Sequence, residues 1–141
     1  MLTGDNKEVI RRFCEEVINQ GRMDSADELV LADFVELDPF PDQGPGREGL
    51  KETIRGLREA FPDIHWNLDE MVAEGEKVAS RFTWTGTHRG PFLGIPATGR
   101  AVAVNGVVID RLEGGRMADS RILMNTFALM VQLGVIPRPG K

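Results

Sequence analysis

Two side chains in this sequence could exchange protons at neutral pH, His88 and Asp38. His88 ends an alternating run that begins at Ser80, and imidazole is the side chain whose ordinary chemistry suits proton transfer near neutrality. Asp38 lies close to Phe34 and Phe40, and apolar surroundings would favour a carboxyl group that keeps its proton. Each residue also has a structural interpretation. His88 could anchor the loop that follows it, and Asp38 could cap a helix or a turn.

The strands that would position these residues run from Lys77 to Met124. Period-two alternation predicts strands over 80–88, 101–110 and 116–124, the last two joined by the turn formers Glu113-Gly114-Gly115. The expected arrangement is therefore an antiparallel sheet. Its inner face would form the wall of a mostly apolar substrate cavity, in which Trp66 and Trp84 would either belong to the core or form an aromatic slot. The predicted substrate-binding residues are Phe34, Phe40, Trp66, Leu68, Phe82, Trp84, Val104, Val108, Ser120, Ile122, Met124 and Asn125.

Helices are expected in the first half of the chain. Apolar residues recur at helical spacing from a capping box at residues 5–8 until Gly21, in a short segment after Asp24, and over 47–60 before Pro62. Residues 38–46 are rich in proline and glycine, which indicates a loop that would form either the cavity rim or a solvated connector. A further strand is predicted over 65–72. Helices first and strands later are typical of an α+β domain, in which a bent antiparallel sheet wraps the helix at 47–60 to make a cone with an open mouth.

Composition excludes several other classes of protein. The 141 residues fit a single domain, 1–141, and a net charge of −5 without basic clusters argues against nucleic-acid binding. No long apolar run or signal peptide is present, so a soluble, cytoplasmic protein is expected. Cys14, the only cysteine, lies among apolar helix positions, where a buried and inert thiol is expected. The two histidines have no partners at metal-ligand spacing, so no metal site is predicted, and no phosphate-binding loop is present.

Four groups of residues carry a likeness to a known family: Gly44-Pro45-Gly46-Arg47-Glu48-Gly49, Ala60-Phe61-Pro62-Asp63, Thr85-Gly86-Thr87-His88-Arg89-Gly90, and 92–100, which reads Phe-Leu-Gly-Ile-Pro-Ala-Thr-Gly-Arg. In this order and at these separations the chain resembles the SnoaL-like polyketide cyclases of the NTF2-like superfamily. The resemblance implies a cone-shaped α+β barrel, a dimer or tetramer, and no cofactor. It also implies an enzyme of secondary metabolism, as in antibiotic biosynthesis, that closes a carbon ring within an apolar, polyketide-like substrate.

The sequence departs from the family pattern where acids and bases are usual. Ser120, Ile122 and Val108 stand where histidine or aspartate is common, and Leu37 separates Glu36 from Asp38 where a histidine often lies. Two mechanisms therefore stay open. Either His88 or Asp38 serves an acid–base aldol closure, or the cavity folds the substrate into a reactive shape and needs no strong base.

Two further functions stay open as alternatives. The missing acids also fit a non-catalytic NTF2-like module that binds small molecules or dimerises. Hydrolase or hydroxylation chemistry could use Asp119, Arg121 and Asn125, although alternation places Asp119 and Arg121 on the face opposite Ser120.

The outer face of the predicted sheet indicates self-association. Val107, Ile109 and Leu123 alternate away from the cavity, and the helix at 47–60 cannot cover that face while it fills the cone. An uncovered apolar sheet face is unusual on a monomer. A homodimer through this face is expected, with Thr85 and Thr87 forming hydrogen bonds across its rim.

Overall fold

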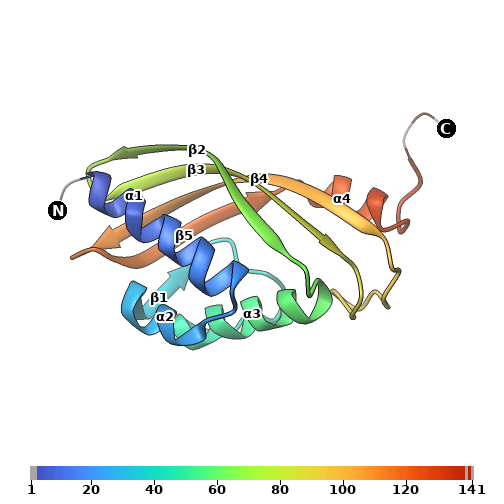
Figure 1. Cartoon of the computed structure of the whole chain (residues 1–141), viewed down its shortest axis with the longest axis horizontal. Coiled ribbons are helices and arrows are strands. Elements are labelled where there is room, and N and C mark those ends of the chain that lie inside the picture. Colours follow the sequence, from blue (N-terminus) through green and yellow to red (C-terminus); the bar gives the residue numbers. More distant parts are fainter. Residues whose placement is uncertain (1–2, 139, 141) are drawn as a thin grey trace.

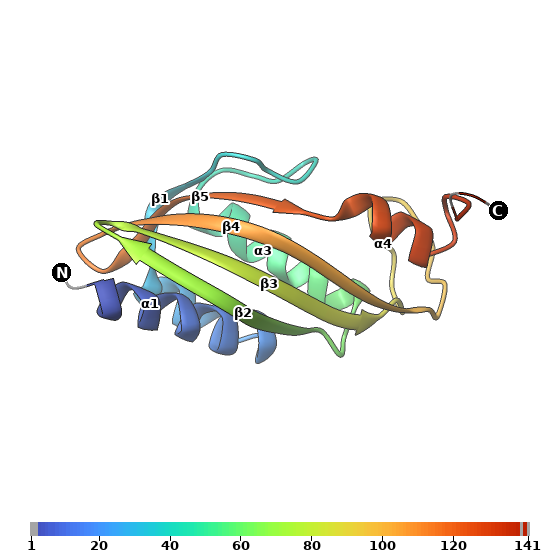
Figure 2. The same cartoon turned by 90° about the horizontal axis from the view of Figure 1, so that it is seen from above.

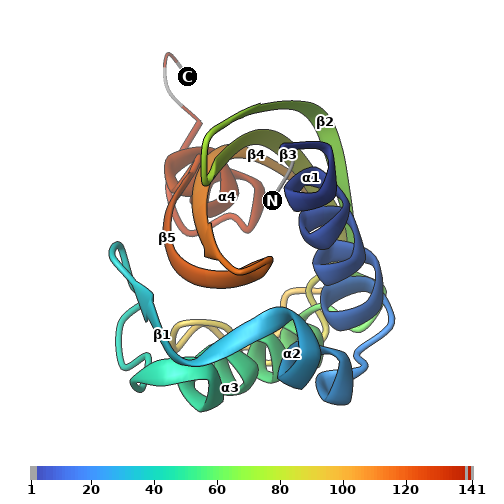
Figure 3. The same cartoon turned by 90° about the vertical axis from the view of Figure 1, so that its left-hand side faces the viewer.

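A curved sheet of five strands arches over the helices of the first half of the chain in the computed structural model, which describes residues 3–138 and 140 (Figure 1). Viewed along the strands, the sheet curls around an interior whose open side is closed by α1 and α3 (Figure 3). The expected α+β fold with a strongly bent sheet is confirmed, and the sheet curls without closing into a complete barrel. The elements in chain order are α1 (Thr3–Arg12), η1 (Phe13–Asn19), α2 (Met23–Leu29), β1 (Val30–Glu36), α3 (Gly46–Ala60), β2 (His65–Glu74), β3 (Lys77–Thr87), β4 (Ala101–Glu113), β5 (Arg116–Met124) and α4 (Thr126–Gln132).

The strand order is β1-β5-β4-β3-β2. Strands β2 to β5 pair antiparallel as expected, and the turn between β4 and β5 contains two glycines with positive φ, Gly114 and Gly115. The prediction of a purely antiparallel sheet was wrong at one edge, because β1 pairs parallel to β5. Alternation in a sequence indicates a strand but not the direction of its partner, and the chain reaches β5 only after α3 and three more strands.

The first helix widens in its second half. Residues 3–12 are α-helical, whereas Phe13–Asn19 form a π-helix, after which the Gln20 amide donates to the carbonyl of Glu15, five residues back, at 3.1 Å. The helix ends at Gly21, whose φ of +73° suits glycine and confirms the expected stop. π-Helical turns are frequent at functional sites, and this one presents Phe13, Cys14 and Ile18 to the interior.

Helix α3 lies against the concave side of the sheet. Its apolar stripe buries Ile54, Leu57 and Ala60, and the helix stops before Pro62 as the sequence predicts. At its beginning the preceding loop passes so close that a Cβ on Gly49 would collide with the carbonyl oxygen of Gly44. The glycine thus fixes the position of the 38–46 loop over the interior.

A register shift in β2 changes the direction of one side chain. A register shift between Leu68 and Glu70 in β2 places Glu70 opposite Arg81, so Glu70 is exposed although uninterrupted alternation would turn it toward the interior.

The helix α4 follows directly after the end of β5 (Figure 2). There Gln132 bonds both backbone groups of Ala103, at 2.7 and 2.9 Å, in place of a neighbouring strand. Within residues 3–138 and 140, no helix is long and apolar enough to cross a membrane.

Candidate active site

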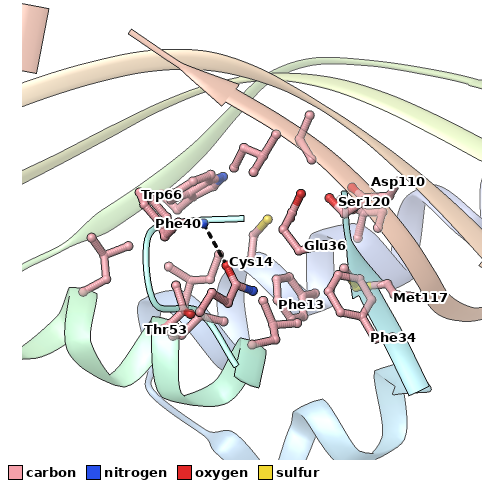
Figure 4. Close-up of a pocket in the computed structure, with 18 of the residues that line it drawn as sticks. Phe13, Cys14, Phe34, Glu36, Phe40, Thr53, Trp66, Asp110, Met117 and Ser120 are labelled. Carbon is pink, nitrogen blue, oxygen red and sulfur yellow. Dashed lines mark hydrogen bonds between the residues drawn. The ribbon is translucent and has the colours of Figure 1, made fainter. Parts of the chain in front are cut away.

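An internal cavity of about 90 Å³ lies between the concave face of the sheet and the helices η1 and α3. Figure 4 shows its wall, in which most side chains are apolar and a few oxygens gather on one side. The lining residues are Ile10, Phe13, Cys14, Ile18, Phe34, Glu36, Phe40, Gln43, Leu50, Thr53, Ile54, Leu57, Trp66, Val108, Asp110, Met117, Ser120, Ile122 and Met124.

The oxygens on this side belong to Glu36, Ser120 and Asp110, which come from three adjacent strands, while Thr53 of α3 and Gln43 of the 38–46 loop contribute polar atoms elsewhere on the wall. Strand register pairs Glu36 of β1 with Ser120 of β5, and Ser120 with Asp110 of β4. Directly paired residues project to the same face of a sheet, so the three side chains form a row across the cavity wall (Figure 4). Asp110 and Ser120 are buried, and Glu36 is partly exposed.

Burial raises the pKa of Asp110 to about 7, and the negative charges of Glu36 and Asp119 act in the same direction. Hydrogen bonding to the Ser120 hydroxyl opposes this shift by favouring the ionised form. Burial likewise raises the pKa of Glu36 to about 7, with the negative charge of Asp38 adding to it. The Asp38 amide opposes this second shift, since its N–H donates to Glu36 Oε2 at 3.0 Å.

These values make the row suited to acid–base chemistry. At neutral pH one carboxyl can be ionised while the other keeps its proton, so the same wall offers a base and an acid. Ser120 lies between them and can accept a hydrogen bond from one and donate one to the other. The apolar remainder of the wall keeps water away from the reacting groups.

Cys14 also faces the cavity but is not a nucleophile. Burial raises the pKa of its thiol, and the negative charges of Asp110 and Glu15 raise it further. The thiol is therefore protonated at any physiological pH and behaves as a small apolar side chain. Its burial confirms the expectation from the sequence.

The predicted wall residues fall into two groups. Those that line the cavity are Phe34, Phe40, Trp66, Val108, Ser120, Ile122 and Met124, whereas Leu68, Phe82, Trp84, Val104 and Asn125 do not. Of the second group, Phe82 lies behind Trp66 in a stacked pair with ring centroids 4.3 Å apart, and Trp84 packs edge-on against Phe61. A side chain that points to the concave face of the sheet need not reach the cavity, because packed core side chains fill part of the space inside the curled sheet.

The two predicted catalytic residues lie away from the cavity lining. His88 is fully buried, stacked on Phe61 at 5.3 Å, and its Nδ1 accepts the Thr98 N–H at 3.2 Å. Its backbone also bonds Arg100 and Gly99, so His88 holds both ends of the 89–99 loop, as its structural interpretation requires. Asp38 is exposed in the bend after β1, where its amide supports Glu36.

The carboxyl pair Glu36 and Asp110 was not among the predicted catalytic residues, although a signal for each exists. Asp110 stands at an even position in the strand whose even residues Val104 and Val108 face inward, so alternation places a carboxylate in the cavity. Glu36 belongs to the acidic pair beside the predicted rim loop, and the same alternation from buried Phe34 turns it inward.

The residues of the hydrolase alternative lie on the outer face. Arg111 Nε donates to Asp119 Oδ2 at 2.7 Å there, and Arg121 is exposed. Asn125 caps α4 by accepting the Ala128 N–H at 3.1 Å. The set therefore does not converge on one site.

The family model of the SnoaL-like polyketide cyclases matches residues 8–133. The chain belongs to the SnoaL-like polyketide cyclase family. The family assignment places it among cyclases and does not favour a non-catalytic binding module of the same fold.

Relatives of this SnoaL-like protein include two named enzymes. The aklanonic acid methyl ester cyclase DauD of Streptomyces sp. (strain C5) is 28% identical over 133 residues, which cover 90% of this chain and 80% of the relative. The aklanonic acid methyl ester cyclase DnrD of Streptomyces peucetius is 26% identical over 132 residues, covering 90% and 89%. Among solved structures, TsrD from Streptomyces laurentii has 29% identity and a TM-score of 0.89, covering 96% of this chain and 99% of TsrD.

Proposed function

We propose that this protein closes a carbon ring within a polyketide-derived substrate by an intramolecular aldol reaction. Glu36 and Asp110 serve as its base and acid. The observation that carries this proposal is the row Glu36-Ser120-Asp110, in which two carboxyls with raised pKa values share one wall of an apolar cavity. The reaction needs only a proton acceptor, a proton donor and an orienting cavity, all of which the chain supplies.

Glu36 is assigned as the base. Its carboxylate is stabilised by the Asp38 N–H, and it is the less buried of the two acids. It removes a proton from a carbon next to a substrate carbonyl, and the resulting enolate carbon attacks a second carbonyl of the same molecule. One C–C bond forms, and the second carbonyl becomes an alkoxide.

Asp110 is assigned as the acid. Its complete burial favours the neutral form, which can donate a hydrogen bond to the developing alkoxide and then its proton. Ser120 connects the two carboxyls, so the proton gained by Glu36 can return to Asp110. The product is an isomer of the substrate, and no co-reactant is consumed.

Aklanonic acid methyl ester, the compound in the names of two relatives, is the first substrate to test. Purified protein should convert it to a product of unchanged mass and different chromatographic retention. Glu36→Gln and Asp110→Asn should each lower the cyclisation rate by about a hundredfold or more. Asp38→Asn is the matched control, because it removes an exposed carboxylate beside the same row and should retain most of the activity. Equal rates in all four proteins would favour shape-directed closure instead.

We also propose a homodimer through the outer sheet face. Val107 and Ile109 of β4 and Leu123 of the neighbouring β5 are exposed there, with Leu123 72% exposed, and Val72 of β2 is exposed on the same face. Contact between two such faces about a two-fold axis would bury them together. The expected rim contact needs one correction, because the Thr87 hydroxyl already donates to Asp63 Oδ2 of its own chain at 2.7 Å.

A further inference from the structure

The inner cavity is small for the substrate of a ring-closing enzyme. Its volume is about 90 Å³, whereas pockets for drug-sized ligands are roughly 300–1,000 Å³. A surface groove of about 250 Å³ lies directly beside it, between α3, the loop at 40–44 and residues 91–93. The two hollows are neighbours because four residues line both, namely Phe40, Gln43, Thr53 and Leu57.

A tight turn separates the cavity from the groove. The Gln43 N–H donates to the Phe40 carbonyl at 3.1 Å. The Phe40 N–H donates to Gln43 Oε1 at 3.2 Å, the bond that is dashed in Figure 4. Pro41 follows Phe40, and Asp42 has a φ of +66°, which together make a type II turn. The turn is closed by its own hydrogen bonds, and Gly44, held close to Gly49 of α3, directly follows it, so the turn has a fixed place between the two hollows.

We propose that this groove is the second compartment of the substrate site, and that the Phe40–Gln43 turn divides one bound molecule between cavity and groove. The reacting carbonyls would lie in the cavity beside Glu36 and Asp110, and the remainder of the molecule would lie in the groove. The inference rests on the proposed function for the identity of the ligand.

Backbone conformation supports the assignment. Among the described residues, only two other than glycine have positive φ, Asp42 at +66° and Leu93 at +49°, and both line this groove. Such conformations are costly and cluster at ligand clamps. Leu93 also presents an exposed leucine side chain at the groove edge, which an apolar ligand would cover.

The lining indicates the chemistry of the bound part. Pro41, Pro91 and Phe92 supply apolar contacts, while Asp42 and Glu52 give the groove a negative edge. A free carboxylate would be repelled there, whereas a neutral ester or a hydroxyl-bearing ring would fit. The groove is therefore assigned to a neutral, largely apolar group of the substrate.

Gly56 offers a way to fill the groove without touching the cavity. It lies on α3, lines the groove but not the cavity, and a Cβ added there would meet nothing within 4 Å. Gly56→Trp should therefore fold normally and occupy the groove. Arg55→Trp is the matched control, since it places the same side chain one residue earlier on the exposed surface, and the ion pair that it removes from groove-lining Glu52 changes a charge that neutral probes do not sense.

Calorimetric titration with two neutral probes tests the proposal without any turnover. 1-Aminoanthracene has three fused rings and requires both compartments, whereas indole is small enough for the cavity. Gly56→Trp should weaken 1-aminoanthracene binding by about tenfold or more and leave indole binding within about twofold, while Arg55→Trp should change neither.

Leu93→Gly provides a second variant that relieves the positive φ and removes one groove contact. It should weaken 1-aminoanthracene binding severalfold without affecting indole. Unchanged affinity for 1-aminoanthracene in both groove variants would overturn the proposal, and equal loss of both probes would show that the two hollows are not separate compartments. Glu36→Gln should lose cyclisation activity but bind 1-aminoanthracene as tightly as wild type. This result would show that the proposed catalytic role of Glu36 and the binding role of the groove are tested independently.

Discussion

Asp110 is a carboxyl group that the fold buries beside negative rather than positive charge, since both Glu36 and Asp119 raise its pKa. A carboxyl in this position would be selected against on stability alone, because its ionisation at neutral pH opposes folding. Within residues 3–138 and 140, Asp110 and Glu36 are the only carboxyl residues that line the cavity. A role in proton transfer explains why Asp110 lies there.

The raised pKa predicts how stability depends on pH. In the folded protein Asp110 has a pKa of about 7, above its unfolded value of 3.8, so folding binds a proton between these values. The free energy of unfolding should therefore fall as the pH rises from about 4 to about 7. Asp110→Asn should remove much of this fall and stabilise the protein by a few kcal/mol, on the order of the linkage expected for a shift of this size, at pH 8 but not at pH 4. Urea unfolding at both pH values measures the difference, and equal stability of wild type and variant at pH 8 would show that Asp110 is not buried as an acid.

At the residue scale, the sequence predicts the apolar wall better than the chemistry. Alternation is sufficient to turn Val108, Ser120 and Ile122 inward. It cannot separate a histidine that anchors a loop from one that transfers protons, because His88 and its partner Thr98 are ten residues apart and meet only through the loop. Asp110 could have been found by the same alternation, since a carboxylate among inward valines has no structural reason to be there.

At the element scale, helix boundaries follow from periodicity, while partners and register do not. The ends of α3 at Gly46 and Ala60 follow from glycine and proline in the sequence. The parallel edge strand β1 and the bulge in β2 depend on contacts between distant segments, so no local pattern predicts them. The pairing of β1 matters most for function, because it brings Glu36 beside Ser120.

Two glycines of α3 should respond oppositely to alanine. Gly56→Ala should raise the free energy of unfolding by about 1 kcal/mol, because the residue is exposed, helical and has open space for a Cβ. Gly49→Ala should lower it, because its Cβ would collide with the Gly44 carbonyl oxygen and displace the 38–46 loop. Thermal and urea unfolding of the pair check this, and a stabilised Gly49→Ala would contradict the close approach of the loop.

Two variants of Asn125 distinguish a role in capping α4 from a role in substrate binding. Its side chain accepts the Ala128 N–H at the beginning of α4, so Asn125→Ala should lower the free energy of unfolding by about 1 kcal/mol, whereas Asn125→Asp should retain the cap. Both variants should keep the cyclisation rate close to wild type. A large loss of rate in a stable Asn125→Asp would instead support the predicted substrate contact.

At the scale of the whole molecule, the curled sheet uses its two faces differently. The concave face encloses the cavity and its carboxyl row, and the convex face carries the exposed Val107, Ile109 and Leu123. The proposed dimer would stabilise the sheet from outside without obstructing the groove, because the groove lies across α3 on the opposite side.

Val107→Arg tests the proposed dimer. A charged side chain in the middle of the outer face should dissociate the dimer, and sedimentation at micromolar concentration should then give the mass of one chain. Glu59→Arg is a useful control, because it also adds positive charge but lies exposed on α3, away from the outer sheet face, and should leave the dimer intact. A wild-type protein that sediments as a stable monomer would contradict the proposal.

The central claim is that Glu36 and Asp110 perform acid–base catalysis, and the pH dependence of kcat/KM tests it most directly. With aklanonic acid methyl ester or another substrate that the protein cyclises, wild type should give a bell-shaped profile with its maximum near pH 7, set by the two carboxyls. Glu36→Gln and Asp110→Asn should each lose about a hundredfold or more at that maximum. A flat profile from about pH 5.5 to 8.5 that both variants retain would contradict the account and leave the shape of the cavity as the source of catalysis.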